Sequence, residues 1–291
     1  MRSTDQRLPS QPAAMRVVGL NIQHGGGRRG PNIAAALAAL HPDVVVLSEF
    51  HPTDPGQKLL KRLAGIGLSH VESRVSPDPA YPNSVAIVSK FPIDDVRAPL
   101  VGSRNGHRVL EARIQDVLVS GVYFPLGGPK VAFWRNEFLP YARQRLAGPA
   151  LLIGDWNSGS HYLDETGATL HGAAEFESMS TMGWCDAWRS LNPDGREFTW
   201  YSSPYNNGFR RPRVPVPVAH AQTRVGTVCA RNPPPRGHRP LGPGHRPGLN
   251  SSRVDVHATS LRAAAIHVGS TITHVGTAGS NPVAPTHVTG I

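Results

Sequence analysis

The seven residues Leu151–Asn157 (LLIGDWN) constrain the fold more than any other stretch of this 291-residue chain. Their three leading apolar residues predict a buried strand, which Gly154 ends. Asp155 and Asn157 follow at alternate positions, so both polar groups can point to the same side of the strand's end. Because burying a carboxylate or an amide without partners costs free energy, other strand ends must supply those partners. The upstream sequence is expected to bring them to this point.

Apolar runs and helical periodicity upstream predict both strands and helices. Predicted strands cover residues 16–22, 44–47, 69–75, 84–89, 107–114, 117–124 and 149–153, and predicted helices cover residues 32–40, 55–65, 131–146 and 173–182. Clusters of Pro, Gly, Asn and Asp separate the four strands between 69 and 124, which is typical of hairpins and meanders rather than of parallel units. The order strand-helix-strand-helix, then a meander, then helix-strand predicts an α/β fold in which helices cover sheets.

Charge and composition divide the chain near residue 210. The formal net charge is +10, but residues 1–210 carry 21 Lys and Arg against 19 Asp and Glu. Residues 211–291 carry nine Arg, one acid, eleven Pro, seven His and no Phe, Trp or Tyr. Such a segment buries too little apolar surface to offset its ordering entropy. We therefore expect a disordered lead over 1–14, one domain over 15–210 and a disordered basic tail over 211–291, either a nucleic-acid-binding arm or a Pro-rich linker.

Several classes of protein are excluded by what the sequence lacks. No run of about 18 apolar residues could span a membrane, and residues 1–14 lack the apolar core of a secretory signal. Two cysteines, Cys185 and Cys229, are too few for a disulfide framework or a metal cage. No Gly-Lys-Ser/Thr follows the glycines at 25–27, which favours a flexible turn over a phosphate cradle. We expect a cytoplasmic protein.

Polar residues end three of the apolar strands. Asn21, Glu49 and Asp155 each lie at or near such an end, and open sheets place their sites where strand ends converge. Amide and carboxylate oxygens are the ligands that Mg²⁺ prefers, whereas no His or Cys spacing here indicates zinc. The sequence therefore predicts a magnesium site. His107 and Arg108 form a further pair, which either faces a substrate or lies on the surface of a hairpin.

Several short motifs occur together in a specific order and spacing. They are LNI (20–22), LSE (47–49), VYFP (122–125), GDWN (154–157), GWCDAW (183–188) and FTWYS (198–202), continuing to NGFR (207–210). With these motifs, residues 15–210 resemble the endonuclease/exonuclease/phosphatase family, the exodeoxyribonuclease III-like superfamily. The resemblance implies a four-layer α-β-β-α sandwich of two packed mixed sheets. It also implies Mg²⁺- or Mn²⁺-dependent hydrolysis of a phosphate ester.

The resemblance further implies a role for each matching residue. Glu49 would be the main metal ligand, with Asn21 beside it holding the metal or the phosphate. Asp155 would orient or deprotonate the attacking water. Asn157 would hold a phosphate oxygen, and Tyr123 would donate a hydrogen bond to the phosphate. These roles are physically coherent, because a divalent ion on the scissile phosphate neutralises developing charge and positions the attack.

Structural alternatives stand beside these roles. Glu49 could be a helix-start acid, and Asp155 and Asn157 could be turn formers. Tyr123 could be a core tyrosine, because Pro125-Leu126 follows where the nuclease branch usually has Pro and then Asn. That departure counts against an abasic-site nuclease.

Two elements expected from the resemblance are missing. Arg211-Pro212-Arg213 stands where Ile/Leu-Asp-His/Tyr is expected, and Ser-Asp-His occurs nowhere. The segment Asp255-Val256-His257 has the wrong spacing and no apolar strand leading to it, so we interpret it as chance. The missing His would pair with an Asp to handle a proton, which typically contributes about 10²–10⁴-fold to rate. We expect the last strands of the second sheet to be missing too, which leaves an exposed edge.

The loss of pattern inside a motif indicates that the chain leaves its native reading frame near Arg210. The Arg, Pro, Gly, His and Ala bias of the tail is typical of GC-rich DNA translated out of frame. The sequence thus predicts a monomeric metal-dependent phosphodiesterase acting on DNA or RNA, with impaired activity. A phosphomonoesterase or lipid phosphodiesterase of the same superfamily, or a non-catalytic basic nucleic-acid binder, are the alternatives.

Overall fold

The computed structural model describes residues 15–196, 200–201, 208–209, 215–217 and 254–256. The strands are β1 (Met15–Asn21), β2 (Val44–Phe50), β3 (His70–Ser73), β4 (Ser84–Ser89), β5 (Asp94–Arg97), β6 (Val109–Ile114), β7 (Val117–Tyr123), β8 (Ala150–Asp155), β9 (Trp184–Asp186), β10 (Trp200–Tyr201), β11 (Gly208–Phe209), β12 (Pro215–Pro217) and β13 (Val254–Val256). The α-helices are α1 (Gly30–Leu40), α2 (Asp54–Ala64), α3 (Pro129–Phe133), α4 (Leu139–Gln144), α5 (Ala173–Met182) and α6 (Ala187–Leu191). Short 3-10 turns lie at Gly27–Arg29 and Gly106–Arg108, and a π-helical turn at Trp134–Phe138 joins α3 to α4.

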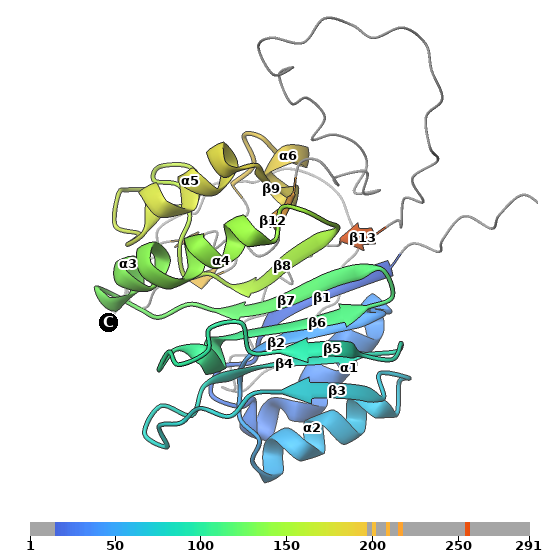
Figure 1. Cartoon of the computed structure of the whole chain (residues 1–291). Helices are drawn as coiled ribbons and strands as arrows, with labels where there is room; N and C mark the ends of the chain where they lie inside the picture. The colour runs from blue at the N-terminus through green and yellow to red at the C-terminus, as the bar shows by residue number, and fades with distance from the viewer. Residues whose placement is uncertain (1–14, 197–199, 202–207, 210–214, 218–253, 257–291) are drawn as a thin grey trace, which may run out of the picture.

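Two mixed sheets form the centre of the molecule. The first has the strand order β13-β1-β2-β4-β3 and the second the order β5-β6-β7-β8. Within them β1 pairs with β2, and β7 with β8, in parallel, while β2-β4-β3 and β5-β6-β7 are antiparallel. Figure 1 shows α1 and α2 on the outer side of the first sheet, and α3, α4 and α5 on the outer side of the second. This arrangement confirms the four-layer sandwich.

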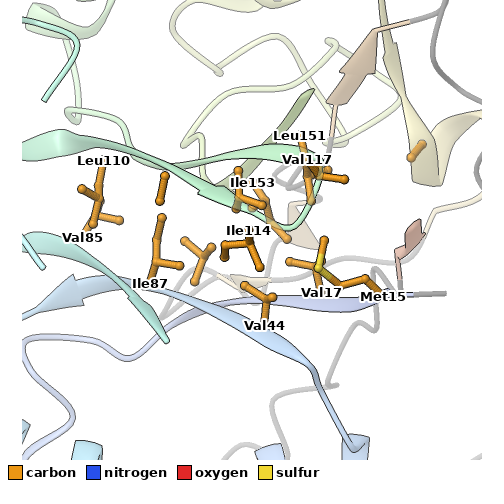
Figure 2. Close-up of a cluster of buried hydrophobic side chains, with 14 of the residues drawn as sticks. Met15, Val17, Val44, Val85, Ile87, Leu110, Ile114, Val117, Leu151 and Ile153 are labelled. Carbon is orange, nitrogen blue, oxygen red and sulfur yellow. The ribbon is translucent and has the colours of Figure 1, made fainter. Parts of the chain in front are cut away.

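The core between the two sheets follows from the strict alternation of side chains along each strand. On β2, Val44 and Val46 belong to the inter-sheet core, whereas Val45 and Leu47 belong to the core beneath α1 and α2. On β8, Leu151 and Ile153 face the first sheet, and Figure 2 shows them across from β1 and β2. Because both faces of each sheet are covered, the central strands are apolar at nearly every position.

The two outer layers have different compositions. Aliphatic side chains fill the space beneath α1 and α2, among them Leu37, Leu59 and Leu63. Aromatic rings dominate beneath α3 to α5, where the ring of Phe124 lies 4.5 Å from that of Trp134 and 5.1 Å from that of Trp156 between centroids. Such contacts add about 0.5–1.5 kcal/mol per pair beyond the burial of area. They anchor the end of β8, where the predicted site begins.

Four local predictions differ from the structure. Gly154 does not end its strand, because β8 continues through Gly154 to Asp155. The single helix predicted over 131–146 is divided by its π-helical turn, beside Pro140 near the start of α4, and proline lacks the N–H that a continuous helix needs. Strand β5 was not predicted, because its residues are polar and mostly exposed. The strand predicted from residue 107 begins at Val109, because the preceding residues form a 3-10 turn.

The predictions for the chain's two ends are less fully covered. The lead over 1–14 lies outside the described residues, as does most of the tail. Within the tail, β12 pairs with β9, and β13 pairs with β1 in parallel, with Asp255 opposite Arg16. Among the described strands of the second sheet, none pairs with β8 on its side away from β7. No helix in the described part of the chain is long and apolar enough to cross a lipid bilayer.

Candidate active site

The predicted residues lie on two parallel strand pairs, one pair in each sheet. Asn21 ends β1, and Glu49 is the last residue but one of its parallel neighbour β2. Tyr123 ends β7 and Asp155 ends β8, and these two residues are direct register partners. Because parallel strands have their carboxyl ends at the same edge of a sheet, each pair brings its two polar residues together.

Asn21 joins the two sheets at this edge. Its side-chain nitrogen Nδ2 donates to Glu49 Oε1 at 2.8 Å and to Asp155 Oδ2 at 2.7 Å. The second bond spans 134 positions of sequence. Three of the five predicted site residues are therefore in direct contact.

Backbone N–H groups orient the same three side chains. Glu49 Oε2 accepts from the N–H of His24 at 2.8 Å, and Asn21 Oδ1 accepts from the N–H of Gln23 at 2.8 Å. Asp155 Oδ1 accepts from the N–H of Asn157 at 3.2 Å. Each carboxylate is thus held on one oxygen by backbone and presents the other to Asn21.

The backbone at Glu49 is bent in a way that sets its direction. Glu49 has φ +59°, in the left-handed region, and the β2–β4 register shifts between Ser48 and Phe50. A non-glycine residue held in such a conformation costs on the order of 1–3 kcal/mol, and a β-bulge of this kind re-aims a side chain. Glu49 lies within β2, so it is not an acid at the start of a helix.

Ser48 ties the two sheets together directly behind the site, and Gly154 allows β7 and β8 to approach closely within the second sheet. Ser48 Oγ donates to the carbonyl of Val122 at 3.1 Å and accepts from the N–H of Asp155 at 3.2 Å. Gly154 has φ +149°, and a Cβ at this position would lie 2.0 Å from the Val122 carbonyl oxygen. Sequence reasoning missed Ser48; its signal is a hydroxyl in an otherwise apolar strand, beside the acid.

Tyr123 is hydrogen-bonded to Asn83, which contacts His51, and sequence reasoning also missed these two residues. Its hydroxyl oxygen accepts from Asn83 Nδ2 at 3.1 Å, and Asn83 Oδ1 lies 2.6 Å from His51 Nε2. Tyr123 is 6% exposed. Burial, and then the charge of Glu49, raise the pKa of Tyr123 above its ordinary value. The phenol therefore keeps its proton at neutral pH.

Arg108 and His107 lie on the 3-10 turn that leads into β6. The guanidinium carbon of Arg108 is 4.9 Å from the ring centre of Tyr123, and its Nε and Nη1 have no hydrogen-bond partner among the described residues. Burial lowers the pKa of Arg108, and the charge and hydrogen bonding of Tyr123 oppose that shift. His107 is buried, so the alternative of a hairpin surface does not hold for it.

The contacts of Asn157 differ from those expected of a residue that holds a phosphate oxygen. Its side chain is 2% exposed, and Nδ2 donates to the carbonyl of Phe124 at 3.1 Å. Its carbonyl accepts a hydrogen bond from the buried ammonium group of Lys130. Asn157 thus contacts Asp155 through its backbone, and its side chain ties the end of β8 to the residue after β7.

The donor set at this edge fits a hard divalent cation. Oxygens from Glu49 and Asp155 approach one point, now occupied by the Asn21 amide nitrogen, within 2.8 Å of each. In the described part of the chain, no group of three or more His, Cys, Asp or Glu side chains could hold a metal ion. Mg²⁺ does not require one, because it commonly binds one or two carboxylates and keeps water or substrate oxygens as its other ligands.

Comparison with known proteins gives a family match and several similar folds. The sequence pattern of the Endonuclease/Exonuclease/phosphatase family matches residues 18–216. An AP endonuclease from Archaeoglobus fulgidus is 19% identical with a TM-score of 0.59, over 72% of this chain and 88% of that chain. A 3'-5' exonuclease from Neisseria meningitidis is 22% identical with a TM-score of 0.56, over 70% and 86%. A 3' phosphatase from Neisseria, bound to product DNA hairpin, is 22% identical with a TM-score of 0.57, over 72% and 88%.

At these identities the likeness to solved structures shows a shared fold. No curated protein sequence matches the chain. The family match overlaps nearly all of residues 15–210, the range over which the motifs predicted one domain of this kind.

Proposed function

Because the chain belongs to the endonuclease/exonuclease/phosphatase family, whose members hydrolyse phosphate esters, we propose that it is a divalent-metal-dependent phosphodiesterase acting on nucleic acid. One observation carries the proposal. Asn21 holds the carboxylates of Glu49 and Asp155 within hydrogen-bond distance of a single atom, from opposite sheets. Two carboxylates brought so close repel each other, so a cation is the ligand that this arrangement favours.

The residues divide between holding the ion and handling the substrate. Glu49 would hold the ion, with Asn21 beside it contributing its oxygen Oδ1, which here accepts the N–H of Gln23. When bound, the ion would neutralise charge on the scissile phosphate. Asp155 orients or deprotonates the attacking water, since its Oδ1 is fixed by backbone and its Oδ2 faces the cluster. Tyr123 donates a hydrogen bond to the phosphate. For Asn157 to hold a phosphate oxygen, its side chain must first release the Phe124 carbonyl.

A DNA substrate with a terminal phosphate is the second candidate. It is favoured by the likeness to the 3' phosphatase bound to product DNA hairpin. The orphaned Nε and Nη1 of Arg108, beside Tyr123, supply donors for additional phosphate oxygens.

The assay follows hydrolysis of a DNA hairpin in two forms, one with an internal phosphodiester only and one with a 3'-phosphate. We expect Mg²⁺- or Mn²⁺-dependent cleavage that a chelator abolishes and that Glu49→Gln reduces by at least about 10²-fold. Glu177→Gln, at an exposed position of α5, is the matched control and should retain activity. Cleavage that survives in Glu49→Gln would contradict the proposal.

A non-catalytic nucleic-acid binder is the rival from another class. Its binding should fall steeply with salt, survive removal of the metal and disappear when residues 211–291 are deleted, because nine of the chain's Arg lie there. Metal-dependent turnover in the intact chain separates the two.

We propose further that the missing Asp-His motifs impair the activity of this chain. The nucleotide sequence after codon 210 tests the change of frame. If neither shifted frame encodes Asp-His and then Ser-Asp-His, the frame hypothesis is wrong. Adding the restored segment should raise kcat by about 10²–10⁴-fold, the usual contribution of a general acid–base group.

A further inference from the structure

The side chains of Tyr123, Asn83 and His51 are hydrogen-bonded in a row that begins at Tyr123 in the candidate site. His51 Nε2 lies 2.6 Å from Asn83 Oδ1, and Asn83 Nδ2 lies 3.1 Å from the hydroxyl of Tyr123. His51 follows Glu49 by two residues, and Asn83 directly precedes β4. These contacts therefore run from the end of β2, the strand that carries Glu49, to Tyr123 on the other sheet.

The Asn83 amide fixes which partner donates in each of these two hydrogen bonds. An amide oxygen only accepts, and an amide nitrogen only donates. Since Asn83 presents its oxygen to His51, the imidazole must carry a proton on Nε2. Since Asn83 presents its nitrogen to Tyr123, the hydroxyl oxygen accepts that bond. The proton of the Tyr123 hydroxyl is then left for another acceptor.

The position of His51 is restrained by the glycine-rich loop. A Cβ at Gly25 would lie 2.8 Å from His51 Nδ1, so the imidazole packs directly against this loop. Gly25 itself donates its N–H to the carbonyl of Glu49 at 2.8 Å. The loop that orients Glu49 thus also supports the imidazole on the side away from Asn83.

We propose that His51 is a positioning residue that, through Asn83, directs the hydroxyl proton of Tyr123 onto a phosphate oxygen of the substrate. This inference rests on the proposed function, because it assigns Tyr123 a phosphate to bind. The raised pKa of Tyr123 supports it, since a phenol that stays protonated remains a donor. The guanidinium of Arg108 lies over the same ring, with its carbon 4.9 Å from the ring centre.

The test reverses the direction of the chain at His51. His51→Lys can only donate to Asn83 and preserves the direction, whereas His51→Glu can only accept, so it turns the Asn83 amide over. The turned amide accepts the Tyr123 proton and withdraws it from the substrate. We expect His51→Glu to lower kcat/KM by about 10-fold to 100-fold, the usual value of one hydrogen bond to a charged group, and His51→Lys to rescue it.

A double-mutant cycle separates this effect from the added charge. In the Tyr123→Phe background no hydroxyl proton exists, so His51→Glu should lower kcat/KM little further. His70→Glu, at an exposed site on β3, controls for a negative charge elsewhere and should keep wild-type kcat/KM. An equal loss from His51→Glu in both backgrounds, or no loss in either, overturns the proposal.

A second measurement does not depend on activity. In ¹⁵N NMR spectra of the uniformly labelled full chain, assigned with His51→Gln, we expect His51 to carry its proton on Nε2. A neutral ring with its proton on Nδ1 alone overturns the proposed direction. If the wild-type chain hydrolyses neither DNA hairpin while His51 is Nε2-protonated, the proposed function fails and the hydrogen-bond direction stands.

Discussion

Gly154 illustrates how one residue fixes the distance between β7 and β8 at the site. It stands directly before Asp155 with φ +149°, and the Val122 carbonyl occupies the space of a side chain. The same carbonyl accepts from Ser48 on the opposite sheet. A side chain at 154 would therefore push β7 and β8 apart and displace the carbonyl that Ser48 binds.

We predict that Gly154→Ala destabilises the fold by roughly 3 kcal/mol, the upper end for strained backbone, because a contact of 2.0 Å with backbone has to be relieved. Urea unfolding followed by tryptophan fluorescence measures the change. Gly148→Ala is the matched control, since nothing lies within 4 Å of a Cβ there. Equal stability of the two variants would contradict the steric account.

Asn21 provides a second prediction at this scale, on the metal. Asn21→Asp replaces the donor between Glu49 and Asp155 by a third carboxylate. We expect the melting temperature to fall in chelator, because three acids then repel one another. Added Mg²⁺ should raise it more than in wild type, since a ligand that binds only the native state stabilises it.

Asn105→Asp is the control for that experiment. Asn105 Nδ2 also donates to a carboxylate, Glu137 Oε1 at 2.9 Å, which is not one of the proposed metal-site residues. Its melting temperature should fall without a comparable gain from Mg²⁺. The same Mg²⁺ response in both variants would argue against a metal site at Asn21.

At the scale of elements, a buried ion pair ties Arg145, the residue after α4, to the second sheet. Glu111 of β6 is 2% exposed, and it accepts from Arg145 Nε at 2.5 Å and from the Tyr141 hydroxyl at 3.0 Å. The Tyr141 hydroxyl also meets Ser120 of β7 at 2.6 Å. Burial, and then the charge of Glu111, raise the pKa of Tyr141, so it remains a neutral donor.

We predict that Arg145→Met destabilises the protein by about 3–5 kcal/mol, because it leaves the Glu111 carboxylate buried without its cation. Chemical denaturation measures the loss. Arg143→Met, at an exposed position of the adjoining helix α4, should change stability by less than about 0.5 kcal/mol. Combining Arg145→Met with Glu111→Leu should recover most of the loss, and failure to do so would show that packing rather than charge is responsible.

Elements with strong periodicity were predictable from sequence, and elements defined by distant contacts were not. The strand at 84–89 and the helix at 173–182 match β4 and α5 in full, and Gly172 and Gly183 cap the helix. By contrast β5 is held mainly by its pairing with β6, which its polar sequence does not reveal.

The same distinction applies to the candidate site. Asn21, Glu49 and Asp155 were predictable because each ends an apolar strand, and the structure brings them into contact. His51 and Asn83 were not, because their bond spans 32 positions and depends on how β2 and β4 pair. The roles assigned to all five of these residues stay predictions until activity is measured.

At the scale of the whole molecule, the site depends on both sheets keeping their relative position. Glu49 belongs to the first sheet and Asp155 to the second, and no single sheet carries both. The inter-sheet core of Figure 2 sets their separation. A change that loosens this core should therefore affect activity even where it touches no site residue, and conditions that weaken the whole fold should do the same.

Acid is such a condition, because His107 is buried beside Arg108 in the 3-10 turn that leads into β6. Burial, and then the charge of Arg108, lower the pKa of His107 to about 4 from 6.5. The unfolded chain therefore binds this proton more readily than the native one. The stability that His107 contributes is present above pH 6.5 and is lost as pH falls through about 4, by at most about 3 kcal/mol.

We accordingly predict that the unfolding free energy of wild type falls more steeply between pH 7 and pH 4 than that of His107→Phe. Urea unfolding at several pH values measures both, and the difference between the two curves isolates His107 from the other groups that titrate in this range. His70→Phe, at an exposed position, controls for the loss of one histidine. Parallel curves for wild type and His107→Phe would mean that the imidazole binds its proton as readily in the native state as in the unfolded chain, with a counter-charge such as Asp78 strong enough to offset both its burial and Arg108.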